Sequence, residues 1–498
     1  MDQNSITPNT SNQQLVINGD NESATALLNE KQGRKRDSLR DVTFIEFMTV
    51  GILCYVNLIN YMDRFTLAGV LGDVKDEFNI GDDYAGFLQT VFVIAYMVFA
   101  PIFGYLGDRY SRRRIMAFGV ALWSLTTFVG SYIPDFAWFA VFRGLVGIGE
   151  ASYSTIAPTI ISDLFVGNVR SKMLALFYFA IPVGSGFGYI VGSAAGAAMG
   201  NWRYGLRVTP FLGALAVVLM LWVMENPERG QAEESRMKPT SYQEDLKSLI
   251  RNPSFMLSTL AFTCVAFVTG ALAWWGPDFI RLGLTLQTGQ EVSIEGVSLV
   301  FGALTMASGL VGVPLGAWLG AALIARWGRA HALLCAAGLL LSAPAMTLAI
   351  FLTDKHYYAP FVLMFFAELT LNLNWAIVAD MSLYVVIPPR RSTAEAFQIL
   401  ISHMFGDAGS PYLVGVISEN LKRSLSPFEE PSNSVKFRSL QYALFITCFV
   451  EVIGGIFFLL TAIYIVRDKL RVEREIAEAE AQSAEPSHSN AQENPGVE

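Results

Sequence analysis

The sequence is organised around one stretch in its first half, Arg143-Gly144-Leu145-Val146-Gly147-Ile148-Gly149-Glu150-Ala151. This stretch places two ionisable residues inside a run that is otherwise apolar enough to cross a bilayer. At 3.6 residues per turn, their spacing returns Arg143 and Glu150 to nearly the same helix face, about 10 Å apart along the axis. A charge near the bilayer centre costs at least about 3 kcal/mol, so it usually faces a cavity or a partner and indicates a transport or proton path. The alternative is a buried ion pair that only fixes helix packing.

The composition is that of a polytopic membrane protein. Of the 498 residues, 53% are hydrophobic and 16% are charged, whereas about 25% charged residues is usual for a soluble globular protein. The formal net charge of −8 lies largely in loops and tails, so it indicates no nucleic-acid partner. We expect no metal and no cofactor, because the cysteines lie singly in different apolar runs, without metal-ligand spacing: Cys54, Cys264, Cys335 and Cys448.

Apolar runs of about 20 residues, the length that spans a bilayer, begin near residues 43, 84, 113, 136, 171, 206, 254, 297, 330, 357, 394 and 438. They predict an all-α polytopic membrane protein with twelve transmembrane helices. The loops after the even-numbered spans are rich in basic residues, as at Arg112–Arg114 and Arg390–Arg391, whereas the loop Ile133-Pro134-Asp135 has none. By the positive-inside rule, both tails are cytosolic.

A charged stretch between the sixth and seventh spans divides six helices from six. We predict five regions: a disordered cytosolic tail (1–42), a six-helix bundle (43–225), a cytosolic linker (226–252), a second six-helix bundle (253–466) and a cytosolic tail (467–498) with a charged helical extension around Arg471–Glu480. The two halves echo each other, since Tyr189-Ile190-Val191-Gly192 in the fifth span corresponds to Tyr412-Leu413-Val414-Gly415 in the eleventh. Such parallel halves are typical of duplicated transporter folds.

The second span is followed by Gly104-Tyr105-Leu106-Gly107-Asp108-Arg109-Tyr110-Ser111-Arg112-Arg113-Arg114. Glycines let helix ends approach closely, and an Asp beside an Arg can form an ion pair that holds one conformation closed. We therefore predict a cytosolic gate at Gly104, Asp108, Arg109 and Arg113; the alternative is an ordinary positive-inside loop. The pattern resembles the signature of the major facilitator superfamily, and Arg143-x-x-x-Gly147-x-Gly149 resembles its second motif. The counterpart from Gly316 to Arg329 lacks an acidic residue.

Further stretches resemble the Spinster family of that superfamily: Asn60-Tyr61-Met62-Asp63-Arg64-Phe65, Gly149-Glu150-Ala151-Ser152-Tyr153-Ser154, Phe179-Ala180-Ile181-Pro182-Val183-Gly184 and Arg390-Arg391-Ser392-Thr393-Ala394-Glu395. The resemblance covers roughly residues 44–466. It implies the major facilitator fold and a transporter of lysolipids or sphingoid lipids. It also implies a location in late endosomes or lysosomes, with the plasma membrane as another possibility. The family's proton-linked charges correspond to Asp63, Arg64, Arg143 and Glu150.

The chemistry of these four residues agrees with that role. Burial favours the neutral form of a carboxyl group, whereas a nearby guanidinium favours the charged form. Because arginine does not titrate, Asp63 and Glu150 are the candidates to carry a proton. Arg64 and Arg143 are their charge partners or contacts for a substrate headgroup. We expect protonation of Glu150 to free Arg143 and to permit the change of conformation.

The second half offers weaker candidates. The tenth span carries three polar or aromatic residues at helical spacing on one face: Glu368, Asn372 and Trp375. Either they line a cavity for a headgroup, or they join neighbouring helices. His403 and Asp407 are an i, i+4 pair on the eleventh span, either structural or titrating at lysosomal pH. Trp274 and Trp275 are expected in an interfacial belt.

Three function classes compete. The leading one is a proton-linked secondary transporter of lysolipids, such as lysophospholipids or sphingosine phosphate. It is expected to work by alternating access as a monomer and to move lipid out of late endosomes or lysosomes. The alternative is a major facilitator carrier of a small polar solute, a sugar or an organic anion, because function lies in the site and not in the fold. A non-transporting receptor or an enzyme is the third, and the sequence contains no Ser-His-Asp order, metal cluster or phosphate loop to support an enzyme.

Overall fold

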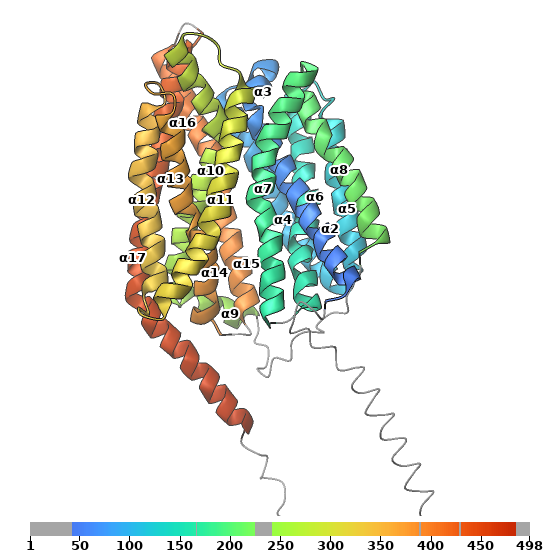
Figure 1. Ribbon diagram of the computed structural model, residues 1–498, viewed down its shortest axis with the longest axis vertical. Helices are drawn as coiled ribbons and strands as arrows, with labels where there is room; N and C mark the ends of the chain where they lie inside the picture. Colours follow the sequence, from blue (N-terminus) through green and yellow to red (C-terminus); the bar gives the residue numbers. More distant parts are fainter. Residues whose placement is uncertain (1–41, 166, 225–241, 388–389, 428–429, 485–498) are drawn as a thin grey trace, which may run out of the picture.

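The structure is a computed structural model that describes residues 42–165, 167–224, 242–387, 390–427 and 430–484. These residues form a bundle of long helices in two groups (Figure 1). The first group comprises α2 (Phe44–Gly69), α3 (Leu71–Phe78), α4 (Asp82–Arg109), α5 (Arg112–Gly130), α6 (Phe136–Leu164), α7 (Gly167–Met199) and α8 (Arg203–Trp222). The end of the bundle that holds α3, opposite the predicted cytosolic end, is called the outer end below.

The second group contains two interrupted helices. It comprises α10 (Pro253–Thr288), α11 (Ile294–Ile324), α12 (Ala330–Leu352), α13 (Ala359–Asn372), α14 (Asn374–Val385), α15 (Arg391–Ser402), the π-helical turn η3 (His403–Asp407), α16 (Gly409–Leu425) and α17 (Asn433–Ala484). The tenth predicted span is broken at Leu373, between α13 and α14. The eleventh consists of α15, η3 and α16, and so carries a π-helical turn within the segment.

The helices coincide with the predicted spans. Nine helices in the described part of the chain are long and apolar enough to cross a membrane. The other three predicted spans coincide with α5, α6 and the α15–α16 segment, which carry charged or polar side chains within or at the start of the helix. The arrangement confirms an all-α, multi-pass membrane protein and is consistent with twelve spans.

The two groups of helices meet along α7 with α11 and along α4 with α16. Gly186 on α7 and Gly302 on α11 face each other so closely that a Cβ on either would meet the carbonyl oxygen of the other. A Cβ on Gly86 of α4 would lie even closer to the Pro411 carbonyl oxygen on α16. Small residues thus let the two groups pack backbone against backbone.

The linker and the C-terminal tail contribute helices of their own. The linker contains α9 (Tyr242–Ile250), which lies at the predicted cytosolic end beneath the bundle (Figure 1). The predicted charged extension is present, because α17 continues to Ala484 beyond the other helices. The predicted tail 1–42, apart from residue 42, and the end of the tail 467–498 lie outside the described residues, as does most of the linker 226–252.

Candidate functional site

Four charged residues meet in the core of the first group of helices. Asp63 and Arg64 are adjacent on α2, so their side chains leave the helix in different directions. Arg143 and Glu150 lie two turns apart on α6. All four are buried, with Glu150 fully enclosed and Arg64 the most exposed at 8%. The predicted site residues of the first half are therefore brought together.

One pair of the cluster joins Asp63 to Arg143. Nη1 of Arg143 lies 3.8 Å from Oδ2 of Asp63, and its Nη2 donates to the backbone carbonyl of Arg64 at 3.2 Å. The carboxylate also accepts from Thr127 Oγ1 on α5 at 3.3 Å and from the hydroxyl of Thr209 on α8. Side chains of three other helices, α5, α6 and α8, thus contact the carboxylate of Asp63.

The second pair joins Arg64 to Glu150. Nη2 of Arg64 donates to Oε2 of Glu150 at 3.0 Å. Oε1 of Glu150 has no hydrogen-bond partner among the described residues. The two pairs therefore run between α2 and α6, and Arg143 and Glu150 do not neutralise each other within α6.

The ring of Phe92 on α4 lies between the two guanidinium groups. Its centroid is 5.0 Å from Cζ of Arg64 and 4.6 Å from Cζ of Arg143, distances at which a cation is attracted to an aromatic face. Gly147 makes this arrangement possible, because a Cβ there would collide with the Phe92 carbonyl. Gly147 thus lets α4 pack against the charges.

The predicted cytosolic gate is only partly described. Arg109 lies over the ring of Tyr105, with 4.2 Å between Cζ and the centroid, and Arg113 donates from Nη1 to the Met224 carbonyl at 3.2 Å. A Cβ at Gly104 would meet no atom of the described residues within 4 Å. The side chain of Asp108 lies outside the described residues.

A neighbouring ion pair in this region was not predicted from the sequence. Arg112 at the start of α5 forms an ion pair with Asp163 near the end of α6. It joins two helices of the same group at the predicted cytosolic end. Asp163 closes an apolar run, and this position near a basic loop is the signal that could have identified it.

In the second group, Glu368 on α13 is bound to hydroxyl groups of α11. It accepts from Thr305 Oγ1 at 3.3 Å and from Ser308 Oγ at 2.9 Å, and Asn372 Nδ2 donates to Ser308 Oγ at 3.5 Å. Glu368 and Asn372 therefore share a partner, as their spacing predicts. Trp375 does not join them, because the helix is interrupted at Leu373 and its ring packs against Phe262, 4.9 Å between centroids.

His403 and Asp407 form the pair that their spacing predicts. His403 Nδ1 lies 2.8 Å from Oδ1 and 2.9 Å from Oδ2 of Asp407. Both residues belong to the π-helical turn η3, and the ring of Tyr96 on α4 lies 6.0 Å from the imidazole. π-helical turns frequently occur at functional sites, and this one faces the first group of helices.

A second buried carboxyl group of the same half lies on α17. Glu451 is fully buried; its Oε1 accepts from Ser342 Oγ on α12 at 2.7 Å, and its Oε2 has no partner among the described residues. Its position was not predicted from the sequence. The signal was available, since Glu451 interrupts an apolar run just as Glu150 does.

A network of charges joins the two groups at the outer end. Asp82 on α4 accepts from Lys75 Nζ at 3.1 Å, and it lies 2.6 Å from Lys422 Nζ on α16. Lys75 also forms an ion pair with Asp278 on α10. Burial alone would lower the pKa of Lys75, but Asp278 and Asp82 more than offset this effect and hold the pKa above its usual range. We call Lys75, Asp82, Asp278 and Lys422 the outer lock.

The prediction that Trp274 and Trp275 form an interfacial belt is wrong. Their side chains are 1% and 0% exposed. Trp274 Nε1 donates to the Ala85 carbonyl on α4 at 3.1 Å, and Trp275 Nε1 donates to the Pro411 carbonyl on α16 at 3.0 Å. A tryptophan needs an apolar site with one acceptor for its N–H, and the contact between the two groups offers this as well as a membrane interface does.

Comparisons with known proteins agree with this architecture. The family model of the Major Facilitator Superfamily matches residues 53–411. A crystal structure titled as a bacterial homolog to the human lysosomal transporter Spinster, in an inward-facing and unoccupied conformation, is similar with a TM-score of 0.77 and 21% identity over 86% of this chain and 99% of that one. A D-xylose-proton symporter is similar with a TM-score of 0.65 and 16% identity, over 83% and 97%. The chain is thus a transporter of the Major Facilitator Superfamily, with an alternating-access fold, and is not an enzyme.

Proteins of similar sequence identify the family within this superfamily. The chain is 56% identical over 483 residues to "Protein spinster" of Drosophila melanogaster, which covers 88% of this chain and 80% of the relative. It is 52% identical over 438 residues to "Protein spinster homolog 1" of Mus musculus, over 86% and 82%. The chain belongs to the Spinster family.

Proposed function

We propose that this transporter carries lysolipids, lysophospholipids or sphingoid lipids such as sphingosine phosphate, in a proton-linked alternating-access cycle. The observation that carries the proposal is the cross-paired cluster of Asp63, Arg64, Arg143 and Glu150. Two carboxyl groups on different helices each bind a guanidinium of the other helix. A proton that neutralises one carboxyl group therefore changes the attraction between α2 and α6.

The geometry sharpens the proton step. The expectation that protonation of Glu150 frees Arg143 is wrong for this conformation, because Glu150 binds Arg64 and Arg143 lies beside Asp63. Protonation of Glu150 should release Arg64 first. The free Oε1 of Glu150 accommodates a proton without the loss of a hydrogen bond. Exchange of partners between Arg64 and Arg143 can then accompany the rocking of the helices.

The conformation supports alternating access. The Lys75–Asp278 and Asp82–Lys422 ion pairs of the outer lock and the hydrogen bond from Trp274 to Ala85 cross between the groups at the outer end. The buried apolar cluster of the second group also extends into the outer ends of α2, α3 and α4. A transporter sealed at this end must break these contacts in order to expose its site there.

Two observations support the proposal of a lipid substrate: the similarity to the Spinster family and the polar side chains around Glu368. Glu368, Ser308 and Asn372 offer a carboxyl, a hydroxyl and an amide within one small region of α11 and α13. Such groups suit a zwitterionic or amine-bearing headgroup. On the same resemblance we propose a location in late endosomes or lysosomes, where a proton gradient is available.

Uptake of labelled lysophosphatidylcholine and sphingosine phosphate by reconstituted protein, with and without a pH gradient, tests the proposal. We expect uptake that the gradient accelerates, and Glu150→Gln should abolish that acceleration because the side chain then mimics the protonated state. Glu473→Gln, on the exposed extension of α17, is the matched control and should behave as wild type. Full pH-dependent uptake by Glu150→Gln would refute the role of Glu150. Uptake of a sugar or organic anion in place of lipid would favour the alternative carrier.

A further inference from the structure

The linker helix α9 is docked to the second group of helices along one side. Arg390 Nε donates to Oδ1 of Asp245 at 2.9 Å, and its Nη1 donates to Ser248 Oγ at 2.9 Å. Leu249 is buried, and Asn252 Nδ2 donates to the Val385 carbonyl at 2.8 Å. These contacts fix α9 at the predicted cytosolic end, so its other side is held in a constant orientation.

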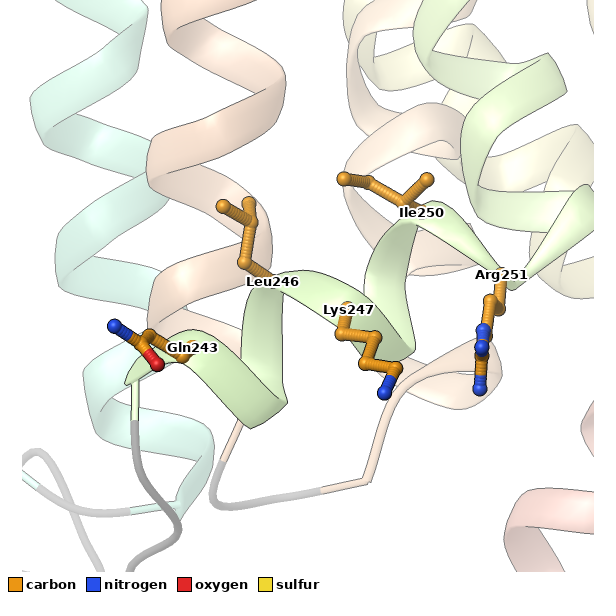
Figure 2. Close-up of a pocket in the computed structure, with 5 residues that line it drawn as sticks. All are labelled: Gln243, Leu246, Lys247, Ile250 and Arg251. Atoms are coloured by element: carbon orange, nitrogen blue, oxygen red, sulfur yellow. The ribbon is translucent and has the colours of Figure 1, made fainter.

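That other side is amphipathic. Gln243, Leu246, Lys247, Ile250 and Arg251 line a shallow pocket on it. Figure 2 shows Leu246 and Ile250 pointing toward the side on which the long helices run, and Lys247 and Arg251 pointing the opposite way. Ile250 is 55% exposed. The helix therefore separates apolar and cationic side chains across its axis at the level of the helix ends.

The charges of Lys247 and Arg251 are not neutralised by an ion pair within the described residues. The adjoining pocket, between α9, the α14–α15 connection and the α17 extension, is lined by more cations than carboxylates: Lys247, Arg251, Arg390 and Arg471 against Glu244 and Glu475. Arg471 is held only loosely by Glu475, at 3.9 Å. The surface thus has a net positive charge beside the exposed Ile250 and the half-buried Leu246.

This combination is complementary to an anionic lipid surface. The cytosolic leaflet carries a negative surface potential that attracts basic segments, and an amphipathic helix at the interface buries its apolar side among the acyl chains. Lysine and arginine extend from such a helix toward the headgroups. We propose that α9 binds anionic phospholipid headgroups of the cytosolic leaflet through Lys247 and Arg251, with Leu246 and Ile250 against the acyl chains. This binding does not depend on which substrate is transported.

Thermal unfolding of the purified full-length protein in detergent tests the proposal, with phosphatidylserine or phosphatidylcholine added at matched mole fractions. Phosphatidylserine should raise the unfolding midpoint more than phosphatidylcholine does, and salt of about 0.5 M should reduce the difference because it screens exposed charges. The double variant Lys247→Gln/Arg251→Gln should need about tenfold more phosphatidylserine for the same shift. Lys247→Arg/Arg251→Lys should behave as wild type, since it keeps both charges.

The matched control is Arg326→Gln/Arg329→Gln, which removes two exposed basic residues from the α11–α12 connection at the same end. It should keep the full preference for phosphatidylserine. An unchanged preference in Lys247→Gln/Arg251→Gln, or an equal loss in both double variants, would overturn the proposal, the latter because it would show a non-specific effect of net charge. Each variant is compared with itself in phosphatidylcholine, so a general loss of stability is separated from a loss of lipid binding.

Discussion

Asp63 and Glu150 in the first half and Glu368 and Glu451 in the second are all buried carboxyl groups, but their surroundings differ. In the first half, Asp63 and Glu150 each bind a guanidinium from another helix. In the second half, Glu368 and Glu451 accept only from hydroxyl groups among the described residues, those of Thr305, Ser308 and Ser342. A guanidinium supports a charged carboxylate at depth, whereas hydroxyl groups can equally satisfy a neutral carboxylic acid.

This difference in surroundings indicates different roles for the two pairs of carboxyl groups. A carboxylate bound to an arginine changes its attraction to another helix when it takes up a proton, so it can couple a proton to movement. A carboxyl group among hydroxyls has no charge partner to release. We therefore expect proton-driven movement in the first half, and a role in packing or headgroup contact for Glu368 and Glu451.

The largest effect should follow from breaking one charge pair of the first half. Arg143→Gln leaves Asp63 buried without its guanidinium, and removal of one partner of a buried pair costs about 3–5 kcal/mol. The double variant Asp63→Asn/Arg143→Gln removes both charges and should recover most of this loss. Unfolding of the purified variants by denaturant measures the difference.

Arg326→Gln, at an exposed position, controls for loss of a positive charge and should change stability by no more than about 0.5 kcal/mol. If the double variant were as unstable as the single one, the two residues would not act as a pair. The proposed exchange of partners would then lack its physical basis.

The next effect concerns the outer lock, where the halves meet. Lys75→Gln leaves Asp82 and Asp278 with one cation fewer, and we expect it to destabilise the sealed conformation by about 2 kcal/mol, since Lys75 is 14% exposed in its side chain. Distances between spin labels at the outer ends of α4 and α16 should show a larger open population than in wild type.

The pH dependence of this effect follows from the raised pKa of Lys75. A lysine with a raised folded-state pKa contributes its stabilisation fully below the unfolded value of about 10.4 and loses it only as the pH rises through the folded value. Between about pH 5 and pH 8 it stays charged, so the difference between Lys75→Gln and wild type should not arise from its titration there. A difference that shrinks on acidification within this range would instead reflect protonation of Asp82 and Asp278, which removes the partners of Lys75.

Much of this organisation was predictable from the sequence. The length of the apolar runs predicts the transmembrane helices. The charged cluster was predictable because an unpaired charge inside the bilayer is too unfavourable to be present without a partner or a function. The pairing was not predictable, because the choice of Arg64 over Arg143 as the partner of Glu150 depends on how α2 and α6 are rotated. The outer lock was missed because Lys75, Asp82 and Asp278 look like ordinary polar residues at helix ends; only tertiary packing buries them together.

A smaller effect should distinguish the two halves in transport. Glu368→Gln keeps acceptor oxygen and size, so the response of lipid uptake to a pH gradient should stay within about twofold of wild type. Glu150→Gln should lose that response. The measurement is uptake by proteoliposomes at several external pH values. Loss of the response in Glu368→Gln would place a proton site in the second half and would break the comparison between the halves.

The smallest effect is expected at Glu451, where neutralisation should change little. Glu451→Gln retains an acceptor for Ser342 Oγ and adds a donor at the position of the unpartnered Oε2, so we expect a change in unfolding free energy below about 1 kcal/mol. Ser342→Ala is the informative partner variant: it removes the hydroxyl donor and should cost about 1–3 kcal/mol, since a buried acceptor is then left unsatisfied. A loss in Glu451→Gln as large as that of Arg143→Gln would mean that Glu451 is ionised and held by a cation. The buried carboxyl groups of the two halves would then not differ in charge. In that case the ion pairs of Asp63 and Glu150 would no longer be a reason to assign proton coupling to the first half.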